Sequence, residues 1–469
     1  MPGKSVLAAV LAVVGIAAVI VAAVMVPRLG RAAGPGRYNV LLITLDTTRA
    51  DHLGCYGYTR KTSPNLDALA ADGVRFDLAI ATSAVTPMSH ASILTGLNPD
   101  RHGVRVFYGP TGHFLTQGHP TLATLLKSHG WQTGGFVSAY PASERFGLNW
   151  GFDTFASEVA PAVMAQDEAL PLPKDGYWVA ERTASAQRRA DATVDQTLQW
   201  LKTCQRPFCL WVHLFDPHDV SLVPPKEIMD RFGASPYARD PYLAAYDPEI
   251  FFMDAQIGRL LDYLKSAGEY NRTIIVAVAD HGQGLGDHNW FPHRLLYQEQ
   301  IRLPLLVRLP GGPRGKVVPS LVRSIDIVPT VLDVLGFEPP EPVQGLSLRG
   351  LIDGRPEPPR TGYAEALNTL DLHTPDPLPQ QHRDLLFCVV EPPWKLIYHF
   401  NTPDNSELYN LASDPQERHN VAAQYRDEVT RLAAVLNESG AMEVEIVEPN
   451  SPLDQEAIEK LRSLGYLGK

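Results

Sequence analysis

The sequence predicts an α/β protein: a doubly wound, mostly parallel sheet flanked by helices, with a small α+β C-terminal subdomain. Three apolar runs without polar alternation support this prediction, because strands buried on both faces of a parallel sheet have that composition. These runs cover residues 40–45, 208–213 and 273–279. Patterns typical of helices lie around and between them, at residues 65–71, 121–129, 190–203 and 247–267.

The charge balance of the chain is acidic. Its 469 residues include 52 acidic and 41 basic side chains, which gives a net charge of −11. An acidic chain without basic clusters argues against nucleic acid as a partner. The four cysteines leave two alternatives open: Cys204 and Cys209 either form a short-loop disulfide in an oxidising compartment or are small buried hydrophobic side chains.

The N-terminal segment is uncharged from residue 5 to residue 26. A helix of that length and composition is long enough to cross a bilayer, and it is longer than the apolar part of a secretory signal. We therefore expect residues 1–37 to be a transmembrane signal anchor followed by a glycine-rich tether. The flanking basic residues do not decide on which side of the membrane the remainder lies.

A change of composition divides the remainder of the chain. A proline-rich stretch at 338–342 predicts a hinge between a catalytic domain at 38–337 and an α+β subdomain at 338–446, with a tail at 447–469. Within the subdomain, residues 385–390 and 394–399 resemble strands, and 420–437 resembles a helix. Residues 157–177 lack any period and predict a long loop.

Two of the predicted strands end in the same kind of side chain. Asp46 follows the first strand, and Asp280 and His281 follow the strand at 273–279. Ligands of open α/β sheets bind at the carboxyl ends of the strands, so these side chains can converge on one cation. A mixed carboxylate and imidazole set favours zinc or a similar transition metal. The alternative is that each aspartate only caps a turn or a helix.

The segment from residue 84 to residue 96 predicts a helix with Thr86 as its N-cap, Pro87 in the first turn and Gly96 just past the end. A threonine at that position is explained by capping alone. However, the N-terminus of a helix also attracts anions, and a hydroxyl beside a metal can act as a nucleophile. Thr86 is therefore a candidate for both roles.

Several segments, in order along the chain, resemble the sulfatase family of the alkaline phosphatase superfamily. They include residues 44–58, 86–104, 251–264 and 278–288. The resemblance implies a metal-dependent hydrolase of sulfate or related esters, with its catalytic domain outside the cytoplasm. Sulfatases carry a C-x-P-x-R or S-x-P-x-R motif, whose first residue becomes formylglycine. That motif falls on Thr86, Met88 and His90, and threonine cannot be converted to this aldehyde.

The metal ligands also depart from the sulfatase pattern. The paired aspartates of the family become Asp46 and Thr47, and its Asp-Asn becomes Asp280 and His281. These changes resemble phosphodiesterases, lipoteichoic acid synthases and phosphoethanolamine transferases, which use threonine with zinc or manganese. We therefore expect Asp46, Asp280, His281 and Thr86 to hold a divalent ion, with zinc or manganese favoured over calcium.

Six further side chains are candidates for supporting roles. His218 and His293 are candidate proton donors, and His90 and Arg49 are candidate substrate contacts. Asp216 and His288 are candidates for a second metal or for supporting the first ligands. Each has a structural alternative, such as a turn, a loop cap or packing against the sheet.

The predicted activity is hydrolysis of a phosphate or sulfate ester through a covalent intermediate on Thr86. The ester would be carried by a lipid, a glycan or a small molecule. The first alternative is a membrane-associated transferase that passes the group to an acceptor. The second alternative is a binding protein without activity.

Overall fold

The computed structural model of the protein describes residues 38–109, 111–157, 187–218, 222–234, 240–371 and 378–446. The predicted anchor and tether at 1–37, the tail at 447–469 and most of the loop expected at 157–177 lie outside these ranges. Within them, no helix combines the length and the apolar character needed to cross a membrane.

The larger sheet has eight strands in the order β4-β3-β5-β1-β6-β7-β2-β8. Their bounds are β1 Asn39–Leu45, β2 Val74–Ile80, β3 Gln132–Val137, β4 Thr154–Ala156, β5 Phe208–Leu214, β6 Thr273–Ala279, β7 Arg302–Arg308 and β8 Lys316–Arg323. Strand β1 lies between β5 and β6 and is parallel to both. Only β7 runs against its neighbours, so the prediction of a mostly parallel sheet is confirmed.

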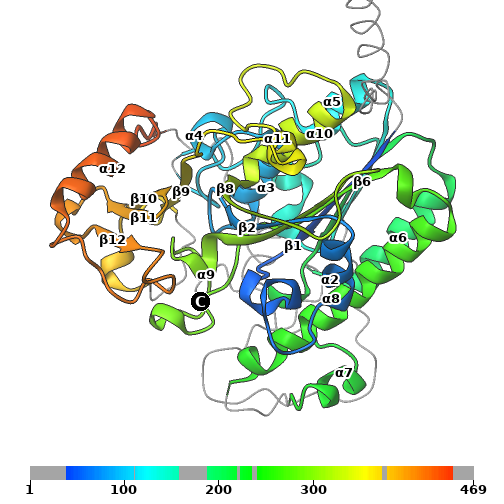
Figure 1. Cartoon of the computed structure of the whole chain (residues 1–469), viewed down its shortest axis with the longest axis horizontal. Coiled ribbons are helices and arrows are strands. Elements are labelled where there is room, and N and C mark those ends of the chain that lie inside the picture. The colour runs from blue at the N-terminus through cyan, green and yellow to red at the C-terminus, as the bar shows by residue number, and fades with distance from the viewer. Residues whose placement is uncertain are drawn as a thin grey trace, which may run out of the picture.

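Helices cover both faces of this sheet (Figure 1). Helices α2, α6 and α8 lie on one face, and α3, α5 and α10 lie on the other. The helices are α2 Pro64–Ala71, α3 Thr86–Thr95, α4 Pro99–His102, α5 Leu122–Ser128, α6 Ala190–Thr203, α7 Lys226–Arg231, α8 Pro241–Ser266, α9 Gln298–Ile301, α10 Ile327–Leu335, α11 Arg349–Asp353 and α12 Arg426–Glu438. Strands β1, β5 and β6 are buried along their whole length, as their apolar sequences predict.

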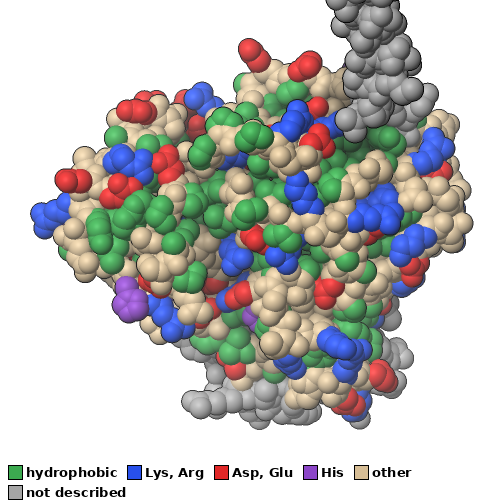
Figure 2. Space-filling view, in the orientation of Figure 1, with side chains coloured by type: hydrophobic (Ala, Val, Ile, Leu, Met, Phe, Trp, Pro, Cys, Tyr) green, Lys and Arg blue, Asp and Glu red, His purple; other side chains and the backbone are tan. Residues whose placement is uncertain are grey.

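The second sheet is antiparallel and comprises β12, β11, β10 and β9. Its strands are β9 Gly362–Leu367, β10 Leu385–Glu391, β11 Trp394–His399 and β12 Glu407–Asn410. Helix α12 packs on it through Leu432 and Leu436, which are buried with Phe387 and Leu396. This is the small C-terminal α+β unit that the sequence predicts. On the face shown in Figure 2, acidic and basic side chains are interspersed with scattered apolar ones.

The structure differs from the sequence predictions at some element boundaries. Helix α8 begins six residues earlier than expected and continues through Pro248, and the Asp240 side chain accepts a hydrogen bond from the backbone N–H of Leu243. Helix α12 begins at Arg426 rather than Asn420, whose side chain instead accepts hydrogen bonds from two backbone N–H groups. All four cysteines are free, which answers the question left open for the disulfide.

Candidate metal centre and active site

The two predicted aspartates meet because of strand pairing. Strands β1 and β6 are parallel neighbours, with Leu45 opposite Ala279, so the next residue of each strand lies at the same edge of the sheet. Asp46, Asp280 and His281 each present a ligand atom within 4.8 Å of the others, and all three are buried. The sheet thus forms a compact donor set at the edge where α/β sheets bind ligands.

The carboxylate of Asp46 is held on one oxygen only. Its Oδ2 lies 3.1 Å from Nε2 of His213 and 3.4 Å from the hydroxyl of Thr86. Its Oδ1 is buried without a hydrogen-bond partner. Burial raises the pKa of Asp46 well above its usual value, although the hydrogen bond from the Thr86 hydroxyl opposes this shift. A buried carboxylate oxygen with no partner is the kind of atom that a cation satisfies.

Asp280 has a similar arrangement. Its Oδ1 accepts hydrogen bonds from the backbone N–H groups of Thr47, at 3.2 Å, and His281, at 2.8 Å. Its Oδ2 is buried without a hydrogen-bond partner. Burial raises the pKa of Asp280, and the nearby charge of Asp46 raises it further. Two buried carboxylates side by side, each with one oxygen that lacks a hydrogen-bond partner, favour a divalent ion between them.

The ring of His281 is oriented by its own backbone. Its Nδ1–H donates to the carbonyl oxygen of Gly282 at 2.9 Å, so the lone pair is on Nε2. That nitrogen lies 3.3 Å from the Thr86 hydroxyl and 3.5 Å from Oδ2 of Asp280. A hydrogen bond of this kind fixes the tautomer that a metal requires. The residues therefore fit a divalent ion.

Thr86 is the first residue of α3, so the helix begins one residue earlier than predicted. Val85 is the N-cap and has extended backbone angles, while Gly96 ends the helix with a positive φ of 73°. The Thr86 side chain is fully buried and faces Asp46 and His281 rather than capping its own helix. The hydroxyl thus lies beside the metal ligands and at the positive end of a helix, where negative charge is favoured.

His213 is a site residue that sequence reasoning missed. It lies on β5, opposite Thr44 of β1, and one ring nitrogen reaches Asp46. The backbone N–H of Ser138 donates to its Nδ1 at 3.3 Å, so Nε2 carries the proton and donates to Asp46. Burial lowers the pKa of His213 to about 3, which keeps the ring neutral. Its signal in the sequence was a histidine at the end of an otherwise apolar strand.

His218 and His293 lie near His281, as the sequence suggests. The ring centres of His293 and His281 are 4.5 Å apart, and those of His293 and His218 are 5.4 Å apart. Burial lowers the pKa of His218 to about 3, and burial with two neighbouring imidazoles lowers that of His293. Both rings are therefore neutral at physiological pH in this arrangement. Their assignment as proton donors stays a prediction.

His90 and Arg49 make contacts that differ from the predicted substrate contacts. The Nδ1–H of His90 donates to the carbonyl of Thr86 at 2.8 Å, and its Nε2 accepts from the hydroxyl of Thr44 at 3.0 Å. Both ring nitrogens are thus engaged inside the protein. Arg49 forms ion pairs with Asp51 at 2.7 Å and Asp287 at 2.8 Å, not with Asp46. Arg49 thus connects the first turn after β1 to the loop that follows β6.

Asp216 lies at the start of a helix. Both of its oxygens accept from the backbone N–H of Ala190, at 3.1 and 3.0 Å, where α6 begins. Burial raises the pKa of Asp216 to about 7. These contacts cap the start of α6. The assignment of Asp216 to a second metal or to support of the first ligands stays a prediction.

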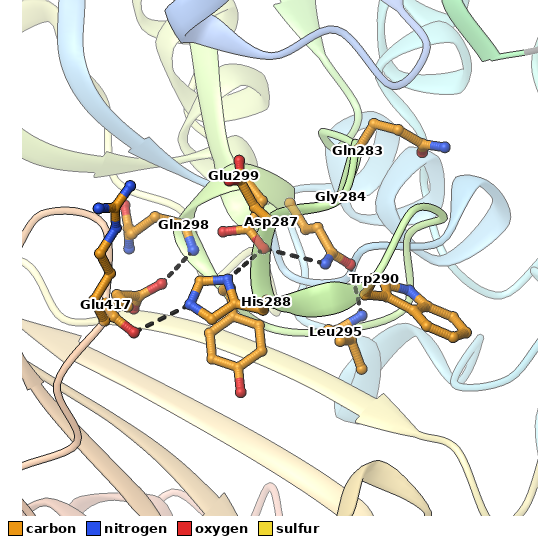
Figure 3. Close-up of polar contacts among 12 residues, drawn as sticks. Gln283, Gly284, Asp287, His288, Trp290, Leu295, Gln298, Glu299 and Glu417 are labelled. Carbon is orange, nitrogen blue, oxygen red and sulfur yellow. Dashed lines mark hydrogen bonds and ion pairs between the residues drawn. The ribbon is translucent and has the colours of Figure 1, made fainter. Parts of the chain in front are cut away.

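His288 faces the C-terminal unit (Figure 3). Its Nδ1 lies 3.0 Å from Glu299 and its Nε2 lies 3.1 Å from the carbonyl of Glu417. The ring stacks on Tyr297 with 3.7 Å between centres. His288 therefore joins the loop after β6 to the second sheet.

Arg294 is a second residue that sequence reasoning missed. Its guanidinium is buried and pairs with Asp371 at 2.6 Å through Nη1, while Nη2 has no hydrogen-bond partner. Besides burial and other neighbours, the charge of Arg294 lowers the pKa of His281 and His293. The residue brings a positive charge close to the candidate metal centre. It has no recognisable signal in the sequence.

Comparison with known proteins places this fold and this site in one family. Residues 38–337 match the sulfatase family model, and residues 286–441 match the model of the C-terminal part of N-sulphoglucosamine sulphohydrolase. The chain therefore belongs to the sulfatase family of the alkaline phosphatase superfamily, a family of ester hydrolases.

Individual relatives are distant but cover most of the chain. An N-acetylglucosamine-6-O-sulfatase of Bacteroides thetaiotaomicron is 23% identical and covers 86% of each chain. An arylsulfatase of Clostridium perfringens is 26% identical over 85% of this chain and 93% of its own. Among solved structures, the phosphonate monoester hydrolase of Agrobacterium radiobacter has a TM-score of 0.64 at 22% identity, covering 86% of this chain and 95% of its own. The last comparison supports the fold alone.

Proposed function

We propose that this protein hydrolyses a phosphoester, with Thr86 as the nucleophile. The observation that carries the proposal is the position of the Thr86 hydroxyl, 3.4 Å from a carboxylate oxygen of Asp46 and 3.3 Å from Nε2 of His281. Asp46, Asp280 and His281 would hold a divalent ion, which supplies positive charge that lowers the pKa of a hydroxyl and stabilises the transferred group.

The chain's own residues provide the remaining steps. Oγ of Thr86 bonds to the phosphorus while the bond from phosphorus to the leaving oxygen breaks. The hydroxyl proton passes to Oδ2 of Asp46, which the Nε2–H of His213 holds in place. The departing alkoxide takes a proton from water on the side of the site where the neutral rings of His218 and His293 lie. The proton on Asp46 returns to Oγ of Thr86 in the last step. Water then attacks the phosphothreonine, releases the phosphate product and restores the threonine hydroxyl.

A threonine nucleophile is better suited to hydrolysis of a phosphate ester than of a sulfate ester. A sulfated formylglycine hydrate releases sulfate by collapsing to its aldehyde, and a threonine ester has no equivalent route. A phosphothreonine can instead be resolved by direct attack of water. The fold shared with a phosphonate monoester hydrolase is compatible with this chemistry.

A second candidate substrate is a sulfated sugar. The relative from Bacteroides thetaiotaomicron is named for removal of a 6-O-sulfate from N-acetylglucosamine, and it covers 86% of this chain. The same nucleophile would then form a sulfothreonine, which must be displaced by water. The two candidates predict opposite orders of activity on paired model substrates.

The test compares three substitutions of Thr86 on bis-p-nitrophenyl phosphate and p-nitrophenyl sulfate, with zinc, manganese or calcium added. Valine keeps the shape of threonine without the hydroxyl, and alanine removes both methyl and hydroxyl. We expect Thr86→Val and Thr86→Ala to lose at least about a thousandfold in kcat, because nucleophile removal has effects of that order. Thr86→Ser retains the hydroxyl and should retain measurable activity.

The outcomes separate the claims. Undiminished turnover by Thr86→Val would exclude Thr86 as the nucleophile. Wild-type turnover of the sulfate ester alone would overturn the preference for phosphorus and support the sulfated sugar. Mass spectrometry of protein quenched during turnover should detect the added group on Thr86.

A further inference from the structure

A second cluster of metal-ligand side chains lies in the C-terminal unit. His382 ends the short 3-10 helix at Gln380–His382, His399 ends β11 and Glu407 begins β12. Their ligand atoms all lie within 4.8 Å of one another. The two histidines are 2% and 1% exposed. We propose that His382, His399 and Glu407 form a second divalent-metal site, separate from that of Asp46, Asp280 and His281.

The spacing of two of the ligands fits a shared ion as well as it fits a long hydrogen bond. Nε2 of His399 lies 3.4 Å from Oε1 of Glu407. Normal hydrogen bonds to nitrogen are about 2.7 to 3.2 Å long. Two neighbouring ligands of a tetrahedral zinc, each bonded at about 2.0 to 2.1 Å, are separated by roughly 3.3 to 3.4 Å. Glu407 and His399 therefore already lie at the distance that a shared ion imposes.

Surrounding groups influence two of the ligands. Oδ2 of Asp384 lies 3.8 Å from Nδ1 of His399, too far for a hydrogen bond, on the side of the ring away from Glu407. The charge of this carboxylate favours the proton on Nδ1, which leaves Nε2 as the nitrogen that can bind an ion. Oε2 of Glu407 accepts hydrogen bonds from Tyr297, at 2.8 Å, and from Tyr409. These bonds direct Oε1 towards His399.

The donor set indicates which ions the site would bind. Two imidazole nitrogens and one carboxylate oxygen suit zinc and similar transition metals, whereas calcium and magnesium prefer oxygen ligands throughout. A water molecule would complete four-coordination. Because the histidines are buried and the carboxylate side chain is 13% exposed, the ion would be nearly enclosed.

The position of the cluster suggests what the ion does. Tyr297 donates to Glu407 and stacks on His288, and the same loop carries His293, whose ring lies beside His281. An ion bound to Glu407 would hold the C-terminal sheet against the loop that borders the active site. Its role would be structural support of the active-site loop from outside the active site.

The test is a metal count on the full chain, stripped with chelator, reloaded with zinc and freed of excess. With both sites formed, the wild type should retain about two zinc ions per chain. His382→Ala/His399→Ala should retain about one, because a site loses its ion when two of its three protein ligands are removed. Asp46→Asn/His281→Ala should also retain about one. The matched control is His419→Ala, whose ring is 82% exposed, and it should bind as the wild type does.

A second measurement avoids the variants. Anomalous diffraction at the zinc edge from wild-type crystals should give a peak between His382, His399 and Glu407. Absence of that peak, or equal zinc content in wild type and His382→Ala/His399→Ala, would overturn the proposal and leave a hydrogen-bonded cluster. A different result is expected if only the active-site metal proposal is wrong. The wild type would then retain about one zinc ion, which would be lost in His382→Ala/His399→Ala and kept in Asp46→Asn/His281→Ala.

Discussion

At the scale of single residues, a short chain of hydrogen bonds leads from the backbone to the proposed nucleophile. The N–H of Ser138 fixes the tautomer of His213, which donates to Asp46, which in turn lies beside Thr86. Each contact restricts the orientation of the next side chain. The carboxylate of Asp46 is thereby left with one oxygen for the hydroxyl and one for a cation.

His213 is expected to act by positioning Asp46. Removing the ring in His213→Ala should lower both metal affinity and kcat/KM by roughly 10- to 100-fold, the usual effect of losing the partner of a metal ligand. His213→Gln places an amide N–H near the position of Nε2 and should recover much of the loss. Metal titration together with steady-state kinetics measures both quantities. Equal defects in the alanine and glutamine variants would contradict the role of the donated hydrogen bond.

The sequence predicts which candidate metal ligands lie together better than it predicts the residues that contact them. Asp46 and Asp280 could be identified because both follow buried strands, and parallel strands end at a common edge. His213 could not, since a histidine within an apolar strand is also typical of the core. The same applies to Arg294, whose partner Asp371 is 77 residues away along the chain.

At the scale of elements, the loop between β6 and β7 connects the two halves of the molecule. Arg49 contacts this loop through Asp287. The C-terminal unit contacts it through the next residue, His288 (Figure 3). Both ring nitrogens of His288 face acceptors, namely Glu299 and the carbonyl of Glu417. Only the protonated ring can donate to both, so the geometry favours the imidazolium.

The loop should therefore be more stable in mild acid. Burial lowers the pKa of His288, but the hydrogen bond and charge of Glu299 outweigh burial and raise it. The unfolded imidazole has a pKa of about 6.5. The stabilisation is therefore complete below that pH and is lost as the pH rises through the higher pKa of the folded state.

Glu299→Gln measures this effect, because it removes the charge that raises the pKa. We expect it to destabilise the protein by about 1.5 kcal/mol in mild acid, as for a hydrogen bond to a charged group, and by much less in mild base. Thermal unfolding of both proteins across this pH range gives the difference. A loss of stability that is independent of pH would show that His288 stays neutral.

Sequence patterns located most helices but not all of their first residues. The helical pattern of the sequence begins only at Asp247. In the structure the helix begins at Pro241 and contains Pro248 in its interior. Helix α8 packs against α6 and α2.

At the scale of the whole molecule, one fully buried ion pair lies between the two sheets. Nζ of Lys395 on β11 is 2.6 Å from Oε1 of Glu417, and both side chains are 0% exposed. The other oxygen of Glu417 accepts from the backbone N–H of Gln298, the first residue of α9, at 2.6 Å. Glu417 thus connects the C-terminal sheet to the end of the active-site loop.

Breaking this pair on one side should be costly. Lys395→Met leaves a buried carboxylate without its partner, and we expect a loss of about 3 to 5 kcal/mol in unfolding free energy. The matched control Lys395→Met/Glu417→Gln removes both charges and keeps an acceptor for Gln298, so it should be more stable than the single variant. Denaturant unfolding of the three proteins tests the order. A double variant less stable than the single one would contradict it.

Sequence reasoning predicted two units but not how they are joined. Lys395, Glu417 and Gln298 come from segments about 20 to 120 residues apart, and no spacing rule relates them. The cluster of His382, His399 and Glu407 escaped prediction for the same reason. Contacts of this kind depend on how the sheets pack, which is set by the whole fold.

The attachment of the active-site loop to the second sheet also bears on how such enzymes diverge. On one side of the loop, the ring of His293 lies beside His281 in the active site. On the other side, Tyr297 donates to Glu407, and His288 contacts the carbonyl oxygen of Glu417. The family model that matches residues 286–441 covers most of this loop together with the C-terminal unit. Substitutions in the second sheet can therefore shift the loop and alter substrate preference while every metal ligand stays unchanged. Substitutions selected for activity on a new substrate can therefore lie well away from the reacting atoms.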